Sequence, residues 1–206
     1  MKTIAKLATV ALGLAACSNG MNASQSDGWI PLFDGQTLNG WQASENPATF
    51  RVENGEIVVH GPRAHLFYMG PVMNHNFTDF ELKADVMTKP GANSGIFIRT
   101  AWQPTGFPSQ GYEVQVNNSQ SDWRRTGSLY AVNDVREAGK DNEWFTMHTI
   151  VRGRNVKIMV NDRQTVDYTE PADSATRMTG NTIALQGHDP GSEVHYKNIM
   201  IRPLTR

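Results

Sequence analysis

The sequence predicts an all-β domain, an antiparallel jelly-roll sandwich of two sheets, and three observations lead to this prediction. Runs of alternating apolar and polar residues, which are typical of strands with one buried face, recur through most of the chain. Gly, Asn, Asp and Pro separate these runs, and no window of a dozen residues keeps a 3.6-residue period. With 206 residues, 39% of them hydrophobic, the chain suits one such domain and is too short for a second full one.

The expected strands follow one another from residue 50 to the C-terminal end of the chain. They are FRVENGEIVVHG (50–61), DFELKADVMT (79–88), SGIFIRT (94–100), GYEVQVNN (111–118), FTMHTIVRGRNVKIMVNDRQTVDYT (145–169), NTIALQG (181–187) and VHYKNIMIRPL (194–204). Asn54 and Gly55 lie between two alternating runs, as in a tight hairpin, and Asn161 and Asp162 form a similar turn. We expect the N- and C-terminal strands to pair within the sandwich, as in a jelly roll.

The first residues have the layout of a bacterial secretory signal. Lys2 and Lys6 precede an apolar run, 7–16, which is shorter than the roughly 20 residues needed to span a bilayer. The run leads into LAAC (14–17), which resembles a lipobox, and Cys17 is the only cysteine of the chain. We therefore expect Cys17 to be lipidated, with an ordinary cleaved signal as the alternative.

These features divide the chain into a lipoprotein signal peptide (1–16), a flexible polar tether (17–27) and one β-sandwich domain (28–206). The expected location is outside the cytoplasm, on a bacterial membrane to which the N-terminal lipid anchors the protein. Ser18 rather than an aspartate follows the lipidated cysteine, and this resembles the sorting signal for the outer membrane, with the domain facing the periplasm.

The charge of the chain argues against a polyanionic partner. Lys and Arg total 19 against 20 Asp and Glu, so the formal net charge is -1. A chain without excess positive charge has no extended field to attract nucleic acid. We therefore expect no nucleic-acid partner.

Six short phrases carry a resemblance to a known family. They are WIPLFDGQTLNGW (29–41), DFELKADVMTKPGANSGIFIRT (79–100), GYEVQV (111–116), TGSLY (126–130), EWFTMHTIVRGRNVKIMVNDRQTVDY (143–168) and GNTIALQGHDPGSEVHYKNIMIRPL (180–204). In this order they resemble the 3-keto-disaccharide hydrolase domain family, from about residue 28 to the end of the chain. The family fold is similar to that of concanavalin-like lectins and glucanases, and this fold serves enzymes and sugar-binding proteins alike.

The resemblance implies cleavage of glycosides that already carry a ketone at carbon 3 of the sugar. The ketone acidifies the proton on carbon 2, so a base can remove it to form an enediolate. The group on carbon 1 then leaves with help from an acid, and water adds to the resulting enone to complete a net hydrolysis. Such a site needs a base, donors for the developing oxyanion and an acid near the leaving oxygen.

The strand GYEVQV offers the carboxylate for this chemistry. If Val114 and Val116 point between the sheets, Glu113 and Gln115 point outward, onto the face that is concave in this type of fold. Glu113, in the middle of a rigid strand, is the expected general base or acid, and Gln115 is an expected substrate contact. The alternative is that Glu113 is a solvated residue paired with a neighbouring cation.

A second strand, 95–99, adds candidate substrate contacts. Alternation places Arg99 on the same face as Phe97, where Arg99 would hold the ketone oxygen or a hydroxyl and Phe97 would lie beneath the sugar ring. The alternative for Arg99 is a salt bridge to Glu113 across the sheet. Asn93, in the preceding turn, is a candidate contact or simply a turn former.

The segment Gln186-Gly187-His188 supplies the third part of the expected site. Gln186 shares the polar face of its strand, and His188 follows the strand end. We expect His188 to be the acid–base partner of Glu113, because histidine titrates near neutral pH; an exposed loop histidine without a role is the alternative. Tyr130 is either a donor to the substrate or a half-buried aromatic residue.

No cofactor is expected, and the histidines give no metal signal. His60, His65 and His75 have no ligand pair at a standard spacing. A structural or catalytic divalent cation bound by carboxylates stays open, the available ones being Asp79, Asp85, Asp134 and Asp141.

The connections 104–111 and 119–143 are expected to form loops around the binding face. Their length favours a partly covered pocket and hence a small glycoside or oxidised disaccharide as the ligand. A separate sugar 3-oxidase, which would form the ketone, is left open as a further partner.

Two other functions compete with ketone-assisted cleavage. Laminarinase-type glycosidases of this fold use an E-x-D-x-x-E arrangement, but after Glu113 this chain has Gln115 and then Asn118 or Ser119 where carboxylates are needed. A non-catalytic carbohydrate-binding module is the stronger rival, since a polar and aromatic sheet face can bind sugar without reacting with it.

Overall fold

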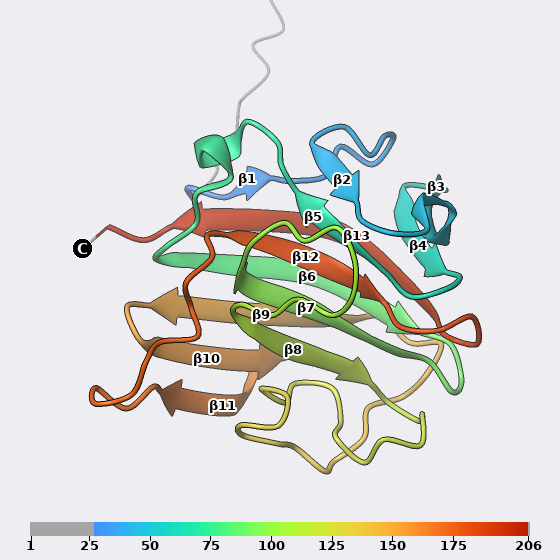
Figure 1. The fold of residues 1–206 in the computed structure, drawn as a ribbon. Helices are drawn as coiled ribbons and strands as arrows, with labels where there is room; N and C mark the ends of the chain where they lie inside the picture. Colours follow the sequence, from blue (N-terminus) through green and yellow to red (C-terminus); the bar gives the residue numbers. More distant parts are fainter. Residues whose placement is uncertain (1–26, 206) are drawn as a thin grey trace, which may run out of the picture.

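The computed structural model describes residues 27–205, which form two antiparallel sheets packed face to face (Figure 1). The predicted all-β sandwich is confirmed: apart from two single-turn 3-10 helices, η1 (Pro47–Thr49) and η2 (Val72–His75), the regular elements of this part are strands. None of its helices is long and apolar enough to cross a membrane. The predicted signal peptide, the lipidation site Cys17 and residues 18–26 of the tether lie outside the described residues.

The larger sheet has eight strands in the order β11-β10-β9-β6-β13-β4-β3, with β1 also pairing with β13. Its strands are β1 (Ile30–Pro31), β3 (Phe50–Glu53), β4 (Glu56–His60), β6 (Phe80–Thr88), β9 (Phe145–Arg152), β10 (Asn155–Val160), β11 (Arg163–Thr169) and β13 (Glu193–Pro203). Because Ile30 pairs with Ile201, the expected pairing of N- and C-terminal strands is confirmed.

The smaller sheet has five strands in the order β2-β5-β12-β7-β8. They are β2 (Trp41–Ala43), β5 (Ala64–Tyr68), β7 (Asn93–Thr100), β8 (Tyr112–Asn117) and β12 (Thr182–Gly187). The loop between β7 and β8, drawn in light green, arcs over β12 and β7 (Figure 1). This sheet and its loops carry the candidate site.

Both predicted hairpin turns form. Asn54 and Gly55 have φ values of 51° and 82°, and Asn161 and Asp162 have 49° and 62°. Two successive residues with positive φ are the requirement of a type I′ turn, which suits the twist of a two-strand ribbon. Asn, Asp and Gly tolerate this backbone at little cost, which explains their positions here.

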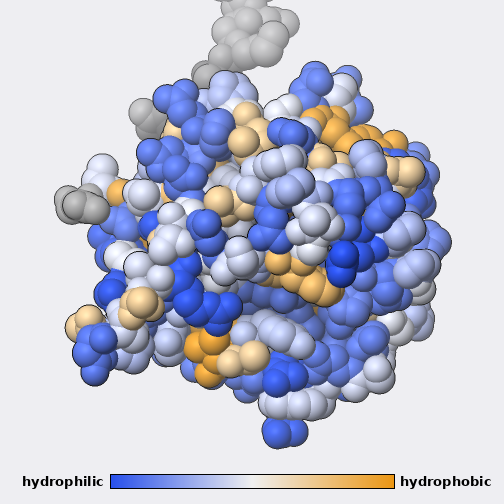
Figure 2. Space-filling view, in the orientation of Figure 1, coloured by the Kyte–Doolittle hydropathy of each residue, from blue (hydrophilic) through white to orange (hydrophobic). Residues whose placement is uncertain are grey.

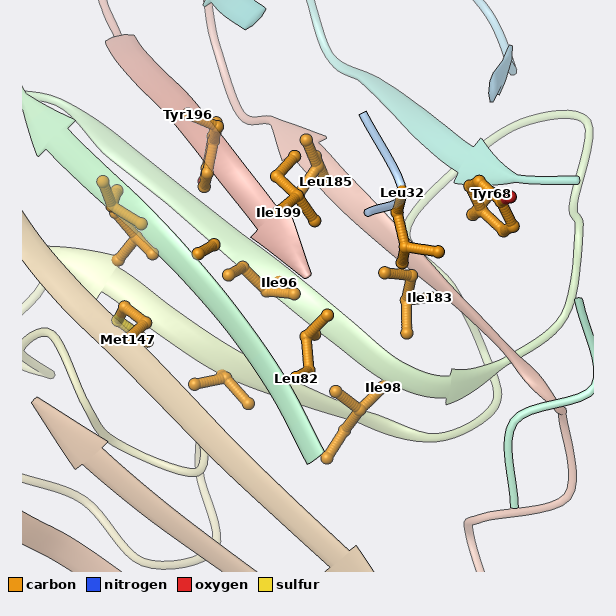
Figure 3. Packing of buried hydrophobic residues seen from close by; sticks show 14 of the residues in the cluster. Leu32, Tyr68, Leu82, Ile96, Ile98, Met147, Ile183, Leu185, Tyr196 and Ile199 are labelled. Carbon is orange, nitrogen blue, oxygen red and sulfur yellow. The ribbon is translucent and has the colours of Figure 1, made fainter. Parts of the chain in front are cut away.

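The core lies between the two sheets (Figure 3). Leu82 and Met147 come from the larger sheet, and Ile96 and Leu185 come from the smaller one; each is at most 2% exposed. Burying each such side chain stabilises the fold by roughly 1.5–3 kcal/mol. Since Val114 is also fully buried here, its neighbours in β8 must point to the opposite, outer face of the smaller sheet.

Candidate active site

Four neighbouring strands bring polar and aromatic side chains together on the outer face of the smaller sheet. Glu113 of β8 is paired with Phe97 of β7, and Phe97 is paired with Ala184 of β12. Two residues further along β12, Gln186 is paired with His65 of β5. Paired residues in adjacent strands point to the same face, so this register sets the composition of the site.

A cavity of about 310 Å³ opens over these positions. The residues that line it are Asn93, Phe97, Phe107, Pro108, Glu113, Gln115, Tyr130, Arg177, Gln186 and His188. A volume of this size is at the lower end of the range for small-molecule sites. Figure 2 shows the same side of the molecule, where exposed hydrophobic residues gather near the middle of a mostly hydrophilic face.

Glu113 is the only carboxylate among the residues that line this cavity. Burial raises its pKa to about 8; the negative charge of Asp122 adds to the increase, and the hydrogen bond from Gln186 opposes it. The Gln186 amide nitrogen donates to Oε1 at 3.0 Å. Within residues 27–205, Oε2 of Glu113 accepts no hydrogen bond, so this oxygen is available to a ligand.

Buried amides support the Glu113 carboxyl from below. Gln115 is fully buried, and with its amide nitrogen turned toward Glu113 it donates to Oε1 at 3.1 Å and to the Ser94 carbonyl at 3.2 Å. The Ser94 hydroxyl donates to the Gln186 carbonyl and lies 2.7 Å from the Tyr196 hydroxyl of the larger sheet. These contacts fix the floor of the site to the core.

His188 follows β12 and lines the cavity, and its side chain is 31% exposed. Its Nδ1 is 2.7 Å from Oδ2 of Asp189, and the Ser192 hydroxyl donates to the same oxygen. The Ser192 hydroxyl in turn accepts the backbone N–H of Asn93 at 2.9 Å. Asp189 therefore holds the imidazole ring in place at the rim of the cavity.

Tyr130 reaches the cavity from the connection between β8 and β9. Its backbone N–H donates to the Glu113 carbonyl at 3.0 Å, and its hydroxyl donates to Oδ2 of Asp122 at 3.0 Å. The Arg124 guanidinium lies 4.8 Å from the Tyr130 ring centroid and forms ion pairs with Asp122 and Asp134. Half-buried Tyr130 is thus fixed by a charged network beside Glu113.

Phe97 and Phe107 form the apolar walls of the site. Phe97 is buried on the sheet, whereas Phe107 belongs to the loop 101–111 and is 46% exposed. Glu45 holds this loop, because its carboxylate accepts the Thr105 hydroxyl and the Gly106 N–H. Hydrogen bonds from Arg63 and Thr105 lower the pKa of Glu45 to about 2, so the loop contact persists over the whole physiological pH range.

The prediction that Arg99 shares the face of Phe97 and contacts the substrate is wrong. The β7–β12 register shifts beside Arg99, whose φ is +53°, and such a bulge redirects the side chain. The Arg99 guanidinium donates to the carbonyls of Gly180, Thr78 and Met178, and it does not line the cavity. The alternative salt bridge to Glu113 is also absent from residues 27–205.

The other predicted contacts, Asn93, Phe97, Gln115, Tyr130 and Gln186, line the cavity together with Glu113 and His188. The sequence interpretation missed Phe107, Pro108 and Arg177, which come from connections without a periodic signal. Arg177 lies 4.6 Å from the Tyr112 ring centroid. Its backbone N–H donates to Glu170, which also accepts the Tyr112 hydroxyl.

Within residues 27–205, no group of three or more His, Cys, Asp or Glu side chains is arranged to hold a metal ion. The carboxylates considered for a divalent cation instead accept protein hydrogen bonds, for example Asp85 from Thr146 and Asn198, and Asp141 from Thr88 and Ser119. The expectation of a site without a metal stays a prediction.

A two-sheet sandwich with a polar and aromatic cavity on one sheet is an architecture of proteins that bind or cleave carbohydrates. A provisionally named glycosyl hydrolase of Parabacteroides distasonis has a similar fold, with a TM-score of 0.71, 22% identity, and coverage of 86% of this chain and 94% of that one. The carbohydrate-binding module CBM66 of Bacillus subtilis has a TM-score of 0.60 and 14% identity, covering 79% of this chain and 95% of that one. These likenesses show the fold.

Residues 28–202 match the 3-keto-alpha-glucoside-1,2-lyase-like domain, and the chain belongs to this family. A relative named 3-keto-disaccharide hydrolase, from Bacteroides thetaiotaomicron, is 26% identical over 171 residues. The aligned part is 69% of this chain and 59% of that protein, so the chain spans about 59% of the length of this curated relative. The resemblance inferred from the six sequence phrases is therefore confirmed.

Proposed function

We propose that this domain cleaves 3-keto-glycosides by ketone-assisted elimination of the aglycone, followed by hydration of the enone. Membership of the family and the name of the Bacteroides thetaiotaomicron relative support the substrate class. The observation that carries the proposal is Glu113, a carboxyl with a pKa raised to about 8 and the only carboxylate lining the cavity. A two-carboxylate glycosidase would need a second one facing the same space.

In this proposal Glu113 removes the proton from carbon 2 of the sugar. A carboxylate with a raised pKa is a stronger base than an ordinary glutamate, and its pKa lies near the working pH, where general bases are most effective. The available Oε2 atom receives the proton, while Gln186 and Gln115 hold Oε1. The Phe97 and Phe107 side chains flank the sugar and exclude water from the reacting carbon.

His188 protonates the leaving oxygen. Asp189 accepts from Nδ1–H, which fixes the orientation of the ring and leaves Nε2 to carry the proton for the leaving oxygen. Arg177 takes the role that Arg99 does not fill, since it is one of the residues that line the cavity. Its guanidinium lies over the Tyr112 ring and within residues 27–205 has no carboxylate partner, so turned toward the sugar it would stabilise the enediolate oxygen.

Aglycone release from a 3-keto-glucoside and from its unoxidised parent tests the function. The soluble domain from residue 26 onward should release the aglycone from the keto sugar only, and His188→Ala should slow release about a hundredfold. A poor aglycone of high pKa should depend on His188 more than a good one, because it needs more protonation. Binding of both sugars without release would instead make this domain a carbohydrate-binding module.

The pH dependence of a variant without the acid reports on the base alone. Because the pKa of Glu113 is raised to about 8, most of the base is protonated and inactive at pH 6, and in His188→Ala, with a good aglycone, kcat/KM should rise about tenfold per pH unit until it levels off above pH 8. Measurement of kcat/KM between pH 5.5 and 9.5 checks this. A profile that is flat above pH 5 would show that the essential base has an ordinary carboxylate pKa.

Gly95 leaves the space that the Glu113 carboxyl occupies. A Cβ atom at position 95 would overlap Oε1 of Glu113 and lie 2.7 Å from its Cγ, so Gly95→Ala should displace the carboxyl and reduce kcat/KM by about tenfold or more. The control is Gly91→Ala, where the added Cβ would meet no atom within 4 Å but the φ of +77° strains an alanine, so it reports the effect of a destabilising substitution that leaves the Glu113 carboxyl in place. Equal activity of the two variants would mean that the position of Glu113 does not matter.

A further inference from the structure

His65 and Gln186 form an unexplained polar pair beside the cavity. They are register partners in β5 and β12, so their side chains are neighbours on the outer face of the smaller sheet. Each residue is 1% exposed. Both ring nitrogens of His65 and the Oε1 atom of Gln186 have no hydrogen-bond partner within residues 27–205.

Aromatic rings enclose the His65 imidazole. Its ring centroid is 5.4 Å from that of Phe97 and 5.7 Å from that of Phe107. Phe107, which covers His65, also lies 6.0 Å from the His188 ring and belongs to the loop held by Glu45. The pair is therefore next to the cavity and covered by one of its walls.

Packing alone does not explain why a histidine occupies position 65. A buried polar group without a partner costs roughly 1–3 kcal/mol, whereas an apolar side chain of similar size would pack against Phe97 and Phe107 without that cost. Burial lowers the pKa of His65 to about 4, so the ring is neutral at pH 7. A neutral imidazole has one N–H donor and one acceptor nitrogen.

We propose that His65 and Gln186 form a hydroxyl-binding position of the active site, at which a hydroxyl accepts from His65 and donates to Oε1 of Gln186. This proposal rests on the proposed function and deepens it. Since Gln186 also donates to Glu113, the bound hydroxyl lies next to the base. Phe107 must move aside for the ligand to enter and then closes over it.

Two molecules can supply this hydroxyl, and they predict different defects. One is the sugar ring of the substrate, in which case the pair contributes to substrate binding and to cleavage. The other is the water that adds to carbon 1 of the enone, in which case the pair contributes only to the second half of the reaction.

The test compares wild type with His65→Leu and His65→Gln, and uses Phe67→Leu as the matched control. Phe67 lies on the same strand and face as His65, is fully buried and packs with Phe97; it has no polar side-chain atoms. Thermal unfolding is measured for every variant. Aglycone release and enone absorbance are followed with a 3-keto-glucoside and with its 4-deoxy and 6-deoxy analogues, and affinity for 3-keto-glucose is measured by calorimetry.

His65→Leu should be at least as stable as wild type, because an unpaired polar group is removed. Its kcat/KM should fall about tenfold or more, with partial recovery in His65→Gln, if a sugar hydroxyl is bound; the fall should then disappear with the deoxy analogue that lacks this hydroxyl. If the attacking water is bound, the release rate should be unchanged and the enone should accumulate.

His65→Leu with raised stability and with unchanged affinity, release and enone level would overturn the proposal and leave His65 a packing residue. The proposal would also be overturned if Phe67→Leu reproduced every defect of His65→Leu, because lost packing would then explain these defects. If wild type released no aglycone at all, the proposed function would fail, but loss of 3-keto-glucose binding in His65→Leu alone would still support the hydroxyl site.

Discussion

Glu113→Gln should reduce aglycone release from a 3-keto-glucoside by about a hundredfold or more, which is the usual contribution of a general base. The amide keeps the size and the hydrogen-bond acceptor of the carboxyl, so Gln186 can still donate to position 113. It has no basic oxygen for the carbon-bound proton. The effect should therefore lie in kcat, with a smaller change in KM.

The same variant should be more stable than wild type at alkaline pH. The folded-state pKa of Glu113 is raised to about 8 from an ordinary value of 4.5, so between these values the folded state binds a proton that the unfolded state has lost. Stability therefore falls as pH rises from about 4.5 to about 8. Removing the carboxyl should recover on the order of 2–4 kcal/mol above pH 8, less than a fully enclosed group would give, because the cavity is open to solvent.

Chemical denaturation of wild type and Glu113→Gln at pH 5, 7 and 9 measures this difference, with Glu53→Gln as the control. Glu53 is exposed and pairs with Arg51, so its replacement should leave both stability and activity nearly unchanged. A Glu113→Gln protein that is active, or that is destabilised equally at all three pH values, would contradict the assignment of Glu113 as a half-buried base.

Arg99→Ala should destabilise the domain by about 2–4 kcal/mol, because charge-assisted hydrogen bonds contribute more than neutral ones and carbonyl groups would lose their donors. The guanidinium now donates to Gly180, Thr78 and Met178. Arg99→Lys should lose most of the same stability, since one ammonium cannot reproduce the planar fork.

Unfolding curves and KM of the folded variant together distinguish this structural role from a role in substrate binding. The matched control is Arg152→Ala, which removes an exposed arginine with one long hydrogen bond of 3.4 Å to the Thr205 carbonyl. A stable Arg99→Ala protein with a strongly raised KM would restore the original prediction that Arg99 binds substrate.

The fold could be predicted because most strands have one face in the core. The alternation of apolar and polar residues predicts strands β6, β9 and β13. The Asn-Gly and Asn-Asp turns predict the two hairpins. Strand β5 was missed because all five of its residues are buried, so AHLFY shows no alternation. The short strands β1 and β2 are too brief for any period to be seen.

Site residues could be predicted where the alternation of a regular strand determines which side chains face the cavity. Glu113, Gln115 and Gln186 follow from the two-residue period of β8 and β12, and that period failed at Arg99, where the strand bulges. Arg177 and Phe107 come from connections whose paths depend on tertiary contacts such as those of Glu170 and Glu45. For His65 the sequence indicates only that no metal-ligand partner lies at a standard spacing. Its position beside Gln186 depends on the pairing of β5 with β12, and β5 could not be predicted.

The central claim is that Glu113 takes a proton from carbon 2 of a ketone-bearing sugar. The most direct measurement is single-turnover aglycone release from a 3-keto-glucoside carrying either hydrogen or deuterium at carbon 2, together with the deuterium content of the product. We predict slower release from the deuterated sugar and loss of its deuterium in wild type. Equal rates with the deuterium retained would contradict the account, because the glycosidic bond would then break without removal of this proton.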